Sequence, residues 1–362
     1  MTANRRRGES TDTDKKTEGL DKGFPFAPTR YYGSKRRQIS WLAQRLLELK
    51  PTLALDAMGG TGTVTHALST LGISVTYSDI LAFNVRAAKG LFCKSGLDLA
   101  HLDSVVDSVL PTHGVVARNF RDIFYTDTEN RWLDGFMEAL ERGEAGDATD
   151  AAFYAVIQAC LKKRPFNLFH RANLYMRTAN VERTFGNAVT WERDFASEVK
   201  KAFRNLVSVR ESLVAPVRVA SARDVLAHDD AFDLVYIDPP YFPRHGNPDT
   251  YVRRYHFLEG LADYQLWEKK IDKASRIRSF YPTYQPDEWR TGSNVLTGLE
   301  CAALKYTKAK IAVSYIEGEH PSIDQIIRVL HRHRARVRKF SMETTTALSS
   351  KKRREVLVLA TN

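Results

Sequence analysis

Four consecutive residues in the second half of the chain carry groups that can orient an amine. The run FDLVYIDPPY ends in Asp238, Pro239, Pro240 and Tyr241, after mostly apolar residues. An amine conjugated to an aromatic ring is a poor nucleophile, and acceptors for its two N–H groups favour a pyramidal nitrogen with an available lone pair. The Asp238 carboxylate and the Pro239 carbonyl are two such acceptors, because the prolines fix φ and offer no competing N–H donor. Tyr241 can stack on the ring.

The same four residues also have a purely structural interpretation, in which a buried strand ends in a turn. A second motif favours the functional interpretation. DAMGGTG (56–62) follows an apolar run and opens a helical pattern, and its glycines let the backbone approach a ligand closely. Asp79 ends the next apolar run, where a carboxylate can accept hydrogen bonds from ribose hydroxyls. The two features together predict a site for an adenosine-type cofactor beside Asp238.

The secondary-structure elements around these motifs predict an α/β fold. Apolar runs over 52–56, 73–80, 232–238 and 310–315 predict strands, and helical patterns separate them. This alternation favours a mostly parallel, twisted, doubly wound sheet with helices on both faces. Its ligands should bind at the carboxyl ends of the strands. Residues 335–342 and 355–361 predict a C-terminal antiparallel hairpin.

The domain organisation follows from where the periodicity changes. Residues 1–24 are polar and charged, which predicts a disordered tail. Residues 101–204 show apolar residues at helical spacing over a stretch too long for one crossover, so we expect an inserted helical recognition subdomain. Residues 25–100 and 205–362 would then form the catalytic domain.

The charge distribution favours a nucleic-acid partner. The chain of 362 residues has a formal net charge of +11. Residues 161–177 carry five Lys or Arg and no acid, with aromatic residues interleaved, and residues 328–354 carry ten Lys or Arg against Glu343 alone. A single basic run is more often a solvated surface, but two runs favour DNA or RNA.

Other classes of protein are disfavoured. The three cysteines are far apart in the sequence and form no metal-binding spacing, so we expect no metal. No apolar run approaches the roughly 18 residues of a membrane span, and the first residues lack the apolar stretch of a signal peptide. We therefore expect a cytoplasmic protein without membrane contact.

The motifs and their order resemble the adenine-specific DNA methyltransferases that modify the N(6) amine and carry an Asp-Pro-Pro-Tyr motif in the alpha arrangement. The likeness runs from about Thr29 to the C-terminus. RYYGSKRRQISWL (30–42) resembles the N-terminal signature of that family, and DAMGGTG resembles its cofactor loop, with Ala57 and Met58 where Pro-Phe is common. The resemblance implies a Rossmann-like methyltransferase fold, S-adenosylmethionine as cofactor, and methyl transfer to a flipped adenine in duplex DNA.

The resemblance also implies roles for individual residues. Lys35 would lie near the cofactor's carboxylate, Asp224 would face its adenine, and Tyr255 would belong to a loop that approaches the flipped base. The cofactor-binding residues are predicted to be Tyr31, Lys35, Asp56, Gly60, Gly62, Asp79 and Asp224. The DNA-binding residues are predicted to be Arg164, Asn167, His170, Arg171 and Tyr255, and the catalytic residues Asp238, Pro239, Pro240 and Tyr241. The partners would be double-stranded DNA and a cognate restriction endonuclease.

Two other functions remain open at this point. An RNA adenine methyltransferase would use the same amine chemistry, and motif spacing separates the two substrates poorly. A non-catalytic DNA-binding protein could keep the fold after losing its chemistry. The intact Asp56, Asp79 and Asp238 argue against the second alternative.

Overall fold

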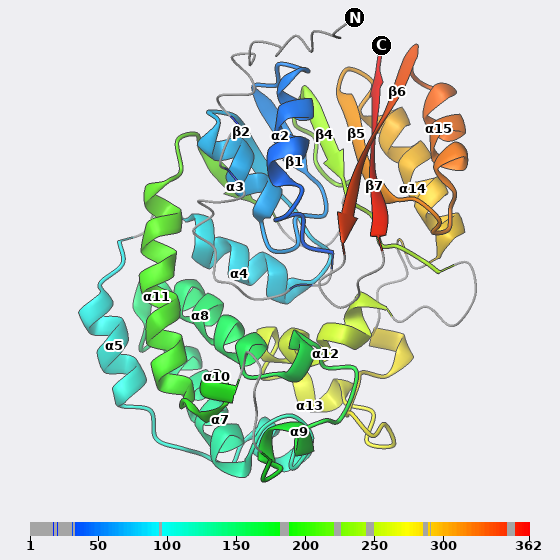
Figure 1. The fold of residues 1–362 in the computed structure, drawn as a ribbon. Coiled ribbons are helices and arrows are strands. Elements are labelled where there is room, and N and C mark those ends of the chain that lie inside the picture. The colour runs from blue at the N-terminus through cyan, green and yellow to red at the C-terminus, as the bar shows by residue number, and fades with distance from the viewer. Residues whose placement is uncertain are drawn as a thin grey trace, which may run out of the picture.

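The computed structural model describes residues 17, 20, 31, 33–93, 96–181, 188–220, 226–243, 250–284, 289, 291–345 and 352–362. Apart from positions 17 and 20, the tail predicted over residues 1–24 lies outside the described residues, and so does Asp224. The described chain forms two lobes, a sheet lobe that contains the C-terminus and a helical lobe below it (Figure 1).

The sheet lobe is built on seven strands in the order β3-β2-β1-β4-β5-β7-β6. Their bounds are β1 Leu53–Asp56, β2 Ser74–Tyr77, β3 Val217–Val219, β4 Leu234–Ile237, β5 Lys310–Ile316, β6 Arg336–Thr345 and β7 Lys352–Thr361. Strands β1 to β5 are parallel, whereas β7 runs antiparallel between β5 and β6. The predicted Rossmann-like sheet and the predicted C-terminal hairpin are both confirmed.

Helices cover both faces of this sheet because its central strands are apolar on both sides. Leu234 and Tyr236 of β4 pack in one core with helices α2 (Ile39–Leu47) and α3 (Thr63–Thr70). Val235 and Ile237 point to the other face and pack with α14 (Gly292–Lys305) and α15 (Ile323–His331). Figure 1 shows these helices on either side of the strands.

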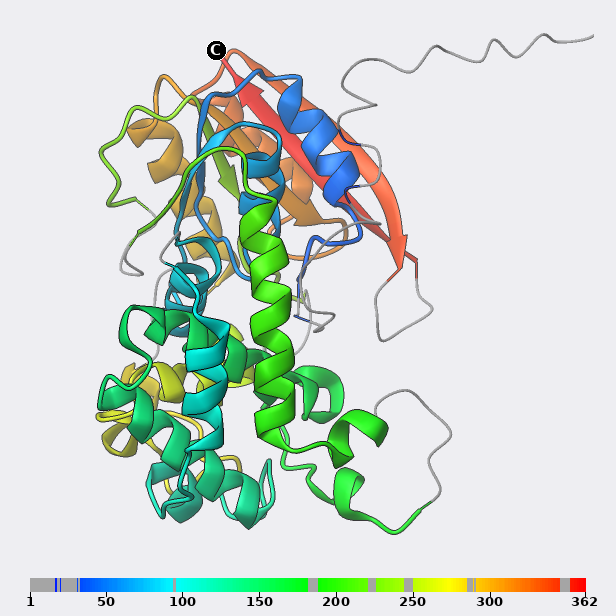
Figure 2. The same cartoon turned by 90° about the vertical axis from the view of Figure 1, so that its left-hand side faces the viewer.

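The helical lobe forms a separate hydrophobic core. Its helices are α5 Leu99–Asp107, α6 Val115–Asn119, α7 Asp127–Glu141, α8 Thr149–Lys162, α9 Tyr175–Thr178, α10 Ala188–Glu192, α11 Phe195–Glu211, α12 Tyr251–Ala262 and α13 Trp267–Lys270, with 3-10 turns at Gly146–Ala148 and Pro165–Asn167. A third 3-10 turn, Pro282–Tyr284, follows them. Figure 2 shows α11 as the long helix that runs from this lobe up to the sheet.

Helices α12 and α13 pack with the helical lobe although their sequence lies beyond residue 204. Phe120 contacts Phe257 and Trp267 with ring centroids 5.1 and 4.9 Å apart. These helices lie within the segment 205–362 that is predicted for the catalytic domain, and their apolar faces complete the aromatic core of the helical lobe. No helix among the described residues is long and apolar enough to cross a membrane.

The lobes meet where α4 (Ala82–Phe92) crosses α8, and a glycine permits this close approach. A Cβ added at Gly90 would lie 2.1 Å from the backbone oxygen of Asp150, and backbone cannot rotate away as a side chain does. Gly96, by contrast, has nothing within 4 Å of its added Cβ.

We therefore expect Gly90→Ala to lower the free energy of unfolding by about 1 to 3 kcal/mol through overpacking. Gly96→Ala is the matched control and should change stability little. Urea unfolding of both variants tests this, and equal midpoints for the two would contradict the packing described between α4 and α8.

Candidate functional site

Three carboxylates meet at the carboxyl ends of three adjacent parallel strands. Asp56 ends β1, Asp79 follows β2 by two residues, and Asp238 follows β4 directly. The register pairs Asp56 with Tyr77 on one side and with Tyr236 on the other. The strand order reverses between β1 and β4, which is where doubly wound sheets bind ligands. The fold therefore brings together the three acids that the sequence predicted for one site.

The glycine loop after β1 is shaped by backbone conformation and by a tyrosine from β2. Gly60 and Gly62 have φ of 51° and 75°, values that side-chain-bearing residues rarely adopt. A Cβ on Gly59 would lie 2.1 Å from the ring of Tyr77, whose hydroxyl donates a 2.7 Å hydrogen bond to the Gly60 carbonyl. Tyr77 thus packs against the loop and stabilises it, a role that no sequence pattern indicated.

The two carboxylate oxygens of Asp56 differ in their hydrogen bonding. Its Oδ2 accepts hydrogen bonds from the backbone N–H and the hydroxyl of Thr65, at 3.1 and 2.7 Å. Its Oδ1 is buried and has no hydrogen-bond partner among the described residues. Burial raises the pKa of Asp56 to about 7. An unpaired buried carboxylate oxygen on the wall of a pocket is a position for a ligand donor.

Asp79 orders the same loop. Its two oxygens accept 2.8 Å hydrogen bonds from the backbone N–H groups of Gly60 and Leu81. Burial raises its pKa, and those two hydrogen bonds partly oppose the rise. Each oxygen keeps a further lone pair, so the carboxylate can still accept hydrogen bonds from a diol.

Asp238 belongs to a short chain of polar contacts. The Tyr241 hydroxyl donates a 2.5 Å hydrogen bond to Asp238 Oδ1, and the Lys35 ammonium lies 3.0 Å from the same oxygen. Lys35 also hydrogen-bonds the Tyr241 hydroxyl. Burial raises the pKa of Asp238 to about 6, and the Lys35 charge opposes that rise.

A single pocket joins these groups. It holds about 780 Å³ of empty space, including its opening to solvent, a size typical of small-molecule sites. Its walls carry the three carboxylates together with the glycine loop, Tyr31, Lys35, Pro240, Tyr251 and Trp289. No cluster of His, Cys, Asp and Glu that could hold a metal occurs in the described part of the chain.

Tyr31 lines this pocket, and Tyr255 packs behind it. Their rings stack with centroids 4.7 Å apart and an interplanar angle of 3°, and Asn84 donates a 3.0 Å hydrogen bond to the Tyr31 hydroxyl. Tyr255 was predicted in a loop, but it lies inside helix α12 and is fully buried. Its position behind Tyr31 indicates support for the pocket rather than direct contact with a large substrate.

Arg164, predicted to contact DNA, is fully buried. Its guanidinium lies over the rings of Phe124 and Phe169, 4.5 and 5.3 Å from their centroids. It also donates hydrogen bonds to the carbonyls of Phe124, Leu168 and Arg171. Burial lowers its pKa to about 10. Arg164 therefore holds the loop together from inside and is placed where DNA cannot reach it.

The other predicted DNA-binding residues lie on the loop that Arg164 organises. Arg171 is exposed, His170 is half-buried and Asn167 is buried, with a φ of 58°. The Phe169 N–H donates to the Arg254 carbonyl at 2.9 Å, which ties the loop to helix α12 beside the pocket. Of these residues, Arg171 is the one best placed to meet a phosphate.

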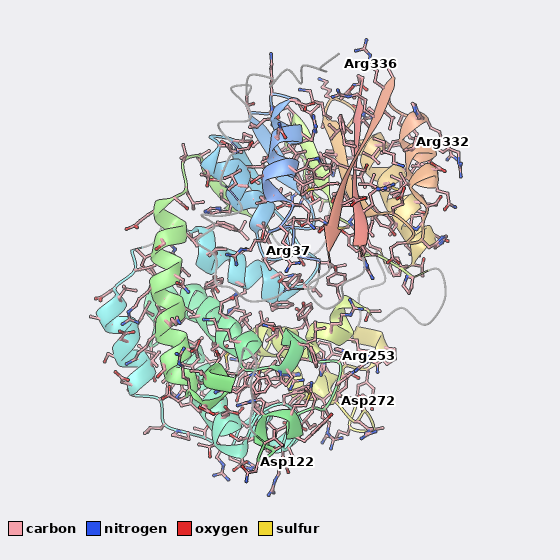
Figure 3. The ribbon with its side chains drawn as sticks, in the orientation of Figure 1. Arg37, Asp122, Arg253, Asp272, Arg332 and Arg336 are labelled. Atoms are coloured by element: carbon pink, nitrogen blue, oxygen red, sulfur yellow. The ribbon has the colours of Figure 1, made fainter. Side chains whose placement is uncertain are left out.

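The labelled arginines outside this loop lie in two different regions of the surface. Figure 3 shows Arg37 and Arg253 on the sides of the two lobes that face each other, whereas Arg332 and Arg336 lie at the far end of the sheet lobe. The strand β6 begins only at Arg336, and Arg334 is buried against the carbonyls of Ala303 and Tyr306. Arg332, Arg334 and Arg336 of the C-terminal basic run therefore lie away from the pocket, whereas Arg354 directly precedes Glu355, which contacts Lys35.

Sequence reasoning missed Tyr251, Trp289 and Glu355. Tyr251 and Trp289 line the pocket, yet no local pattern distinguishes them from other aromatic residues. Glu355 contacts Lys35 from β7. A lone acid at the head of the otherwise apolar run EVLVLA is the signal that could have indicated it.

We expect Arg164→Ala to lower the free energy of unfolding by about 2 to 4 kcal/mol, because it leaves buried carbonyls without donors. Arg171→Ala removes an exposed arginine from the same loop and should change stability by less than about 0.5 kcal/mol. Thermal and urea unfolding of both variants provide the measurement. A neutral Arg164→Ala would show that the residue is not buried as described.

Comparisons with known proteins identify the family of this chain. The D12 class N6 adenine-specific DNA methyltransferase family matches residues 31–282. The chain is 23% identical over 281 residues to "Type II methyltransferase M2.HphI" of Haemophilus parahaemolyticus, covering 72% of this chain and 83% of that protein. The solved structure of the rRNA methyltransferase aviRa from Streptomyces viridochromogenes aligns with 97% of this chain and 94% of its own, at 14% identity and a TM-score of 0.33, which is too low to carry an argument. Because the family match spans well over half of the sequence and contains all three strand-end carboxylates, the chain belongs to the D12 class of N6 adenine-specific DNA methyltransferases.

Proposed function

We propose that the protein binds S-adenosylmethionine in the pocket and methylates the N6 amine of an adenine flipped out of duplex DNA. The observation that carries this proposal is the placement of Asp238. Its ion-pair partner Lys35 and its hydrogen-bond donor Tyr241 both contact Oδ1, and Oδ2 has no partner among the described residues. A carboxylate oriented through one oxygen can accept an amine N–H with the other.

The pocket suits a sulfonium cofactor with a ribose. Asp79 can accept the ribose hydroxyls while it keeps the glycine loop in place. The unpaired Asp56 Oδ1 can accept a hydrogen bond from the cofactor's ammonium group. When bound, S-adenosylmethionine supplies a methyl group on a positively charged sulfur, and the acidic walls of the pocket complement that charge.

The chain's own residues position the target amine. Asp238 Oδ2 and the Pro239 carbonyl can accept its two N–H groups, which favours a lone pair directed away from both acceptors. Pro239 and Pro240 hold this acceptor pair rigid, since their φ angles are fixed. Positioning of this kind can supply most of the rate acceleration, so no separate base is needed before attack.

The helical lobe offers the surface for DNA. The loop of residues 164–171 presents Arg171 and the half-exposed ring of Phe166, and α12 presents Arg253 at the junction of the lobes (Figure 3). Arginine heads can bind phosphates, and an exposed ring can stack on a base. The name of the M2.HphI relative contains "Type II methyltransferase". We infer from it a cognate restriction endonuclease that cuts the same site.

Asp238→Ala should abolish methyl transfer to duplex DNA while cofactor binding survives, because the acceptor is lost but the cofactor loop is untouched. Transfer of labelled methyl groups measures the first effect, and calorimetry with S-adenosylmethionine measures the second. Wild-type rates in the variant would refute the catalytic assignment.

The same labelled cofactor separates the rival functions. Wild-type protein is offered duplex DNA and RNA of the same sequence, and methyladenine is expected in the DNA. Methylation of RNA alone would favour an RNA adenine methyltransferase. If the wild-type protein binds no S-adenosylmethionine, a non-catalytic DNA-binding protein becomes the better description.

The value of kcat/KM should fall as the pH drops through about 6. Burial raises the pKa of Asp238 to that value, and only the ionised carboxylate leaves both oxygens as acceptors. Burial also raises the pKa of Asp56 to about 7, so the profile is measured with saturating cofactor, and Asp56→Asn, which removes that second carboxylate, should keep the acid limb near 6. A flat profile down to pH 5, with the protein folded by circular dichroism, would contradict the role of Asp238.

A further inference from the structure

A second buried carboxylate reaches the Lys35–Asp238 pair from the edge of the sheet. Glu355 is 2% exposed, and its Oε1 accepts hydrogen bonds from Lys35 Nζ and from the Ser314 hydroxyl, both at 2.7 Å. Lys35 therefore lies between two carboxylates, one following β4 and one on β7. The family match ends at residue 282, so both Ser314 and Glu355 lie outside it.

This cluster is unusual for its place in the fold. Glu355 begins a run in which Val356 to Ala360 are all buried, and Ser314 is fully buried within the apolar strand β5. Burying a charge costs free energy that ion pairing only partly offsets, and apolar residues of similar volume often stabilise a core as well or better. Stability alone therefore does not account for a Lys, a Glu and a Ser converging beside Asp238.

All three polar partners of Lys35 belong to the catalytic motif or to β7. Lys35 donates hydrogen bonds to Glu355 Oε1 and to the Tyr241 hydroxyl, and its ammonium lies 3.0 Å from Asp238 Oδ1. The role near the cofactor's carboxylate, which the family resemblance implies for Lys35, stays a prediction. In this structure the contacts of the lysine connect the catalytic motif to Glu355.

The charges also do not cancel. Asp238 and Glu355 together carry two negative charges against the single positive charge of Lys35, which leaves one negative charge next to the amine site. Burial lowers the pKa of Lys35, but the two carboxylates raise it further, so the ammonium stays charged. Methyl transfer to a neutral amine places positive charge on nitrogen, and a fixed negative charge in a buried site stabilises it.

We propose that Glu355 is a positioning residue for methyl transfer, which holds the Lys35 ammonium against Asp238 Oδ1 and keeps the amine site negative. This proposal rests on the proposed function and adds a residue to its machinery. Ser314 fixes the Glu355 carboxylate through the 2.7 Å hydrogen bond to the oxygen that Lys35 also contacts. Glu355 acts through Lys35 and Asp238, without touching the substrate.

The test compares Glu355→Gln and Glu355→Asp with wild type, using duplex DNA and labelled S-adenosylmethionine. Glu355→Gln keeps the shape but removes the charge, so kcat should fall by about 10- to 100-fold, with the KM for the cofactor unchanged. The acid limb of its pH profile should move to lower pH, because the Glu355 charge raises the pKa of Asp238. Glu355→Asp restores the charge and should recover part of kcat and the original acid limb.

The control is Glu343→Gln. Glu343 lies on the neighbouring strand β6, and its side chain is 61% exposed. This variant should keep wild-type kinetics. A purely structural Glu355 would lower the melting temperature of Glu355→Gln without shifting the acid limb, and that result would overturn the proposal. A raised KM for the cofactor with kcat unchanged would also overturn it, since it would place Lys35 at the cofactor. If Glu355→Gln does not fold, Glu355→Asp decides: a kcat below wild type with an unchanged acid limb is expected, because the shorter side chain draws the carboxylate away from Lys35, and a wild-type kcat would refute positioning.

The failure of the proposed function is a separate outcome. It would appear as a wild-type protein that transfers no methyl group to duplex DNA in the same assay. Wild-type transfer with normal kinetics in Glu355→Gln would refute the role of Glu355 alone.

Discussion

The structure depends on burying several carboxylates at one edge of a parallel sheet. Asp56, Asp79 and Asp238 end neighbouring strands, and burial raises the pKa of each. Buried carboxylates that lie this close together stay ionised only when hydrogen-bond donors or positive charges surround them. The groups that stabilise these carboxylates come from the glycine loop, from α3 and from Lys35. Several elements of the sheet lobe therefore contribute to keeping the carboxylates ionised.

The helical lobe is connected to that edge through α12. Glu259 on α12 accepts the backbone N–H groups of Ala82 and Phe83, at 3.0 and 3.1 Å, and so caps the start of α4. Tyr255, one turn earlier, stacks on Tyr31 in the pocket wall. Burial raises the pKa of Glu259 to about 7, which marks another carboxylate held at the junction. Helix α12 thus connects the helical lobe directly to the pocket wall.

Local sequence patterns predicted that the strand-end acids and the glycine loop lie together, for a physical reason. Strand-end acids and a glycine loop must follow their strands directly, so their positions in space are set by a few neighbouring residues and the order of the sheet. The recognition region was harder. Arg164 and Arg171 look alike in a basic run, but aromatic rings and carbonyls enclose only the first, and those partners include Phe124, forty residues away.

The sequence by itself determined the fold class, the glycine loop and the strand-end acids, because each of these depends on short stretches of contiguous residues. Only the tertiary structure decided that residues 251–280 join the helical lobe and that Lys35 meets Glu355, 320 positions later. That contact exists because β7 inserts antiparallel between β5 and β6 and carries its first buried residue to the catalytic edge. No local pattern encodes such a pairing, since it depends on the register of strands that lie far apart in the chain.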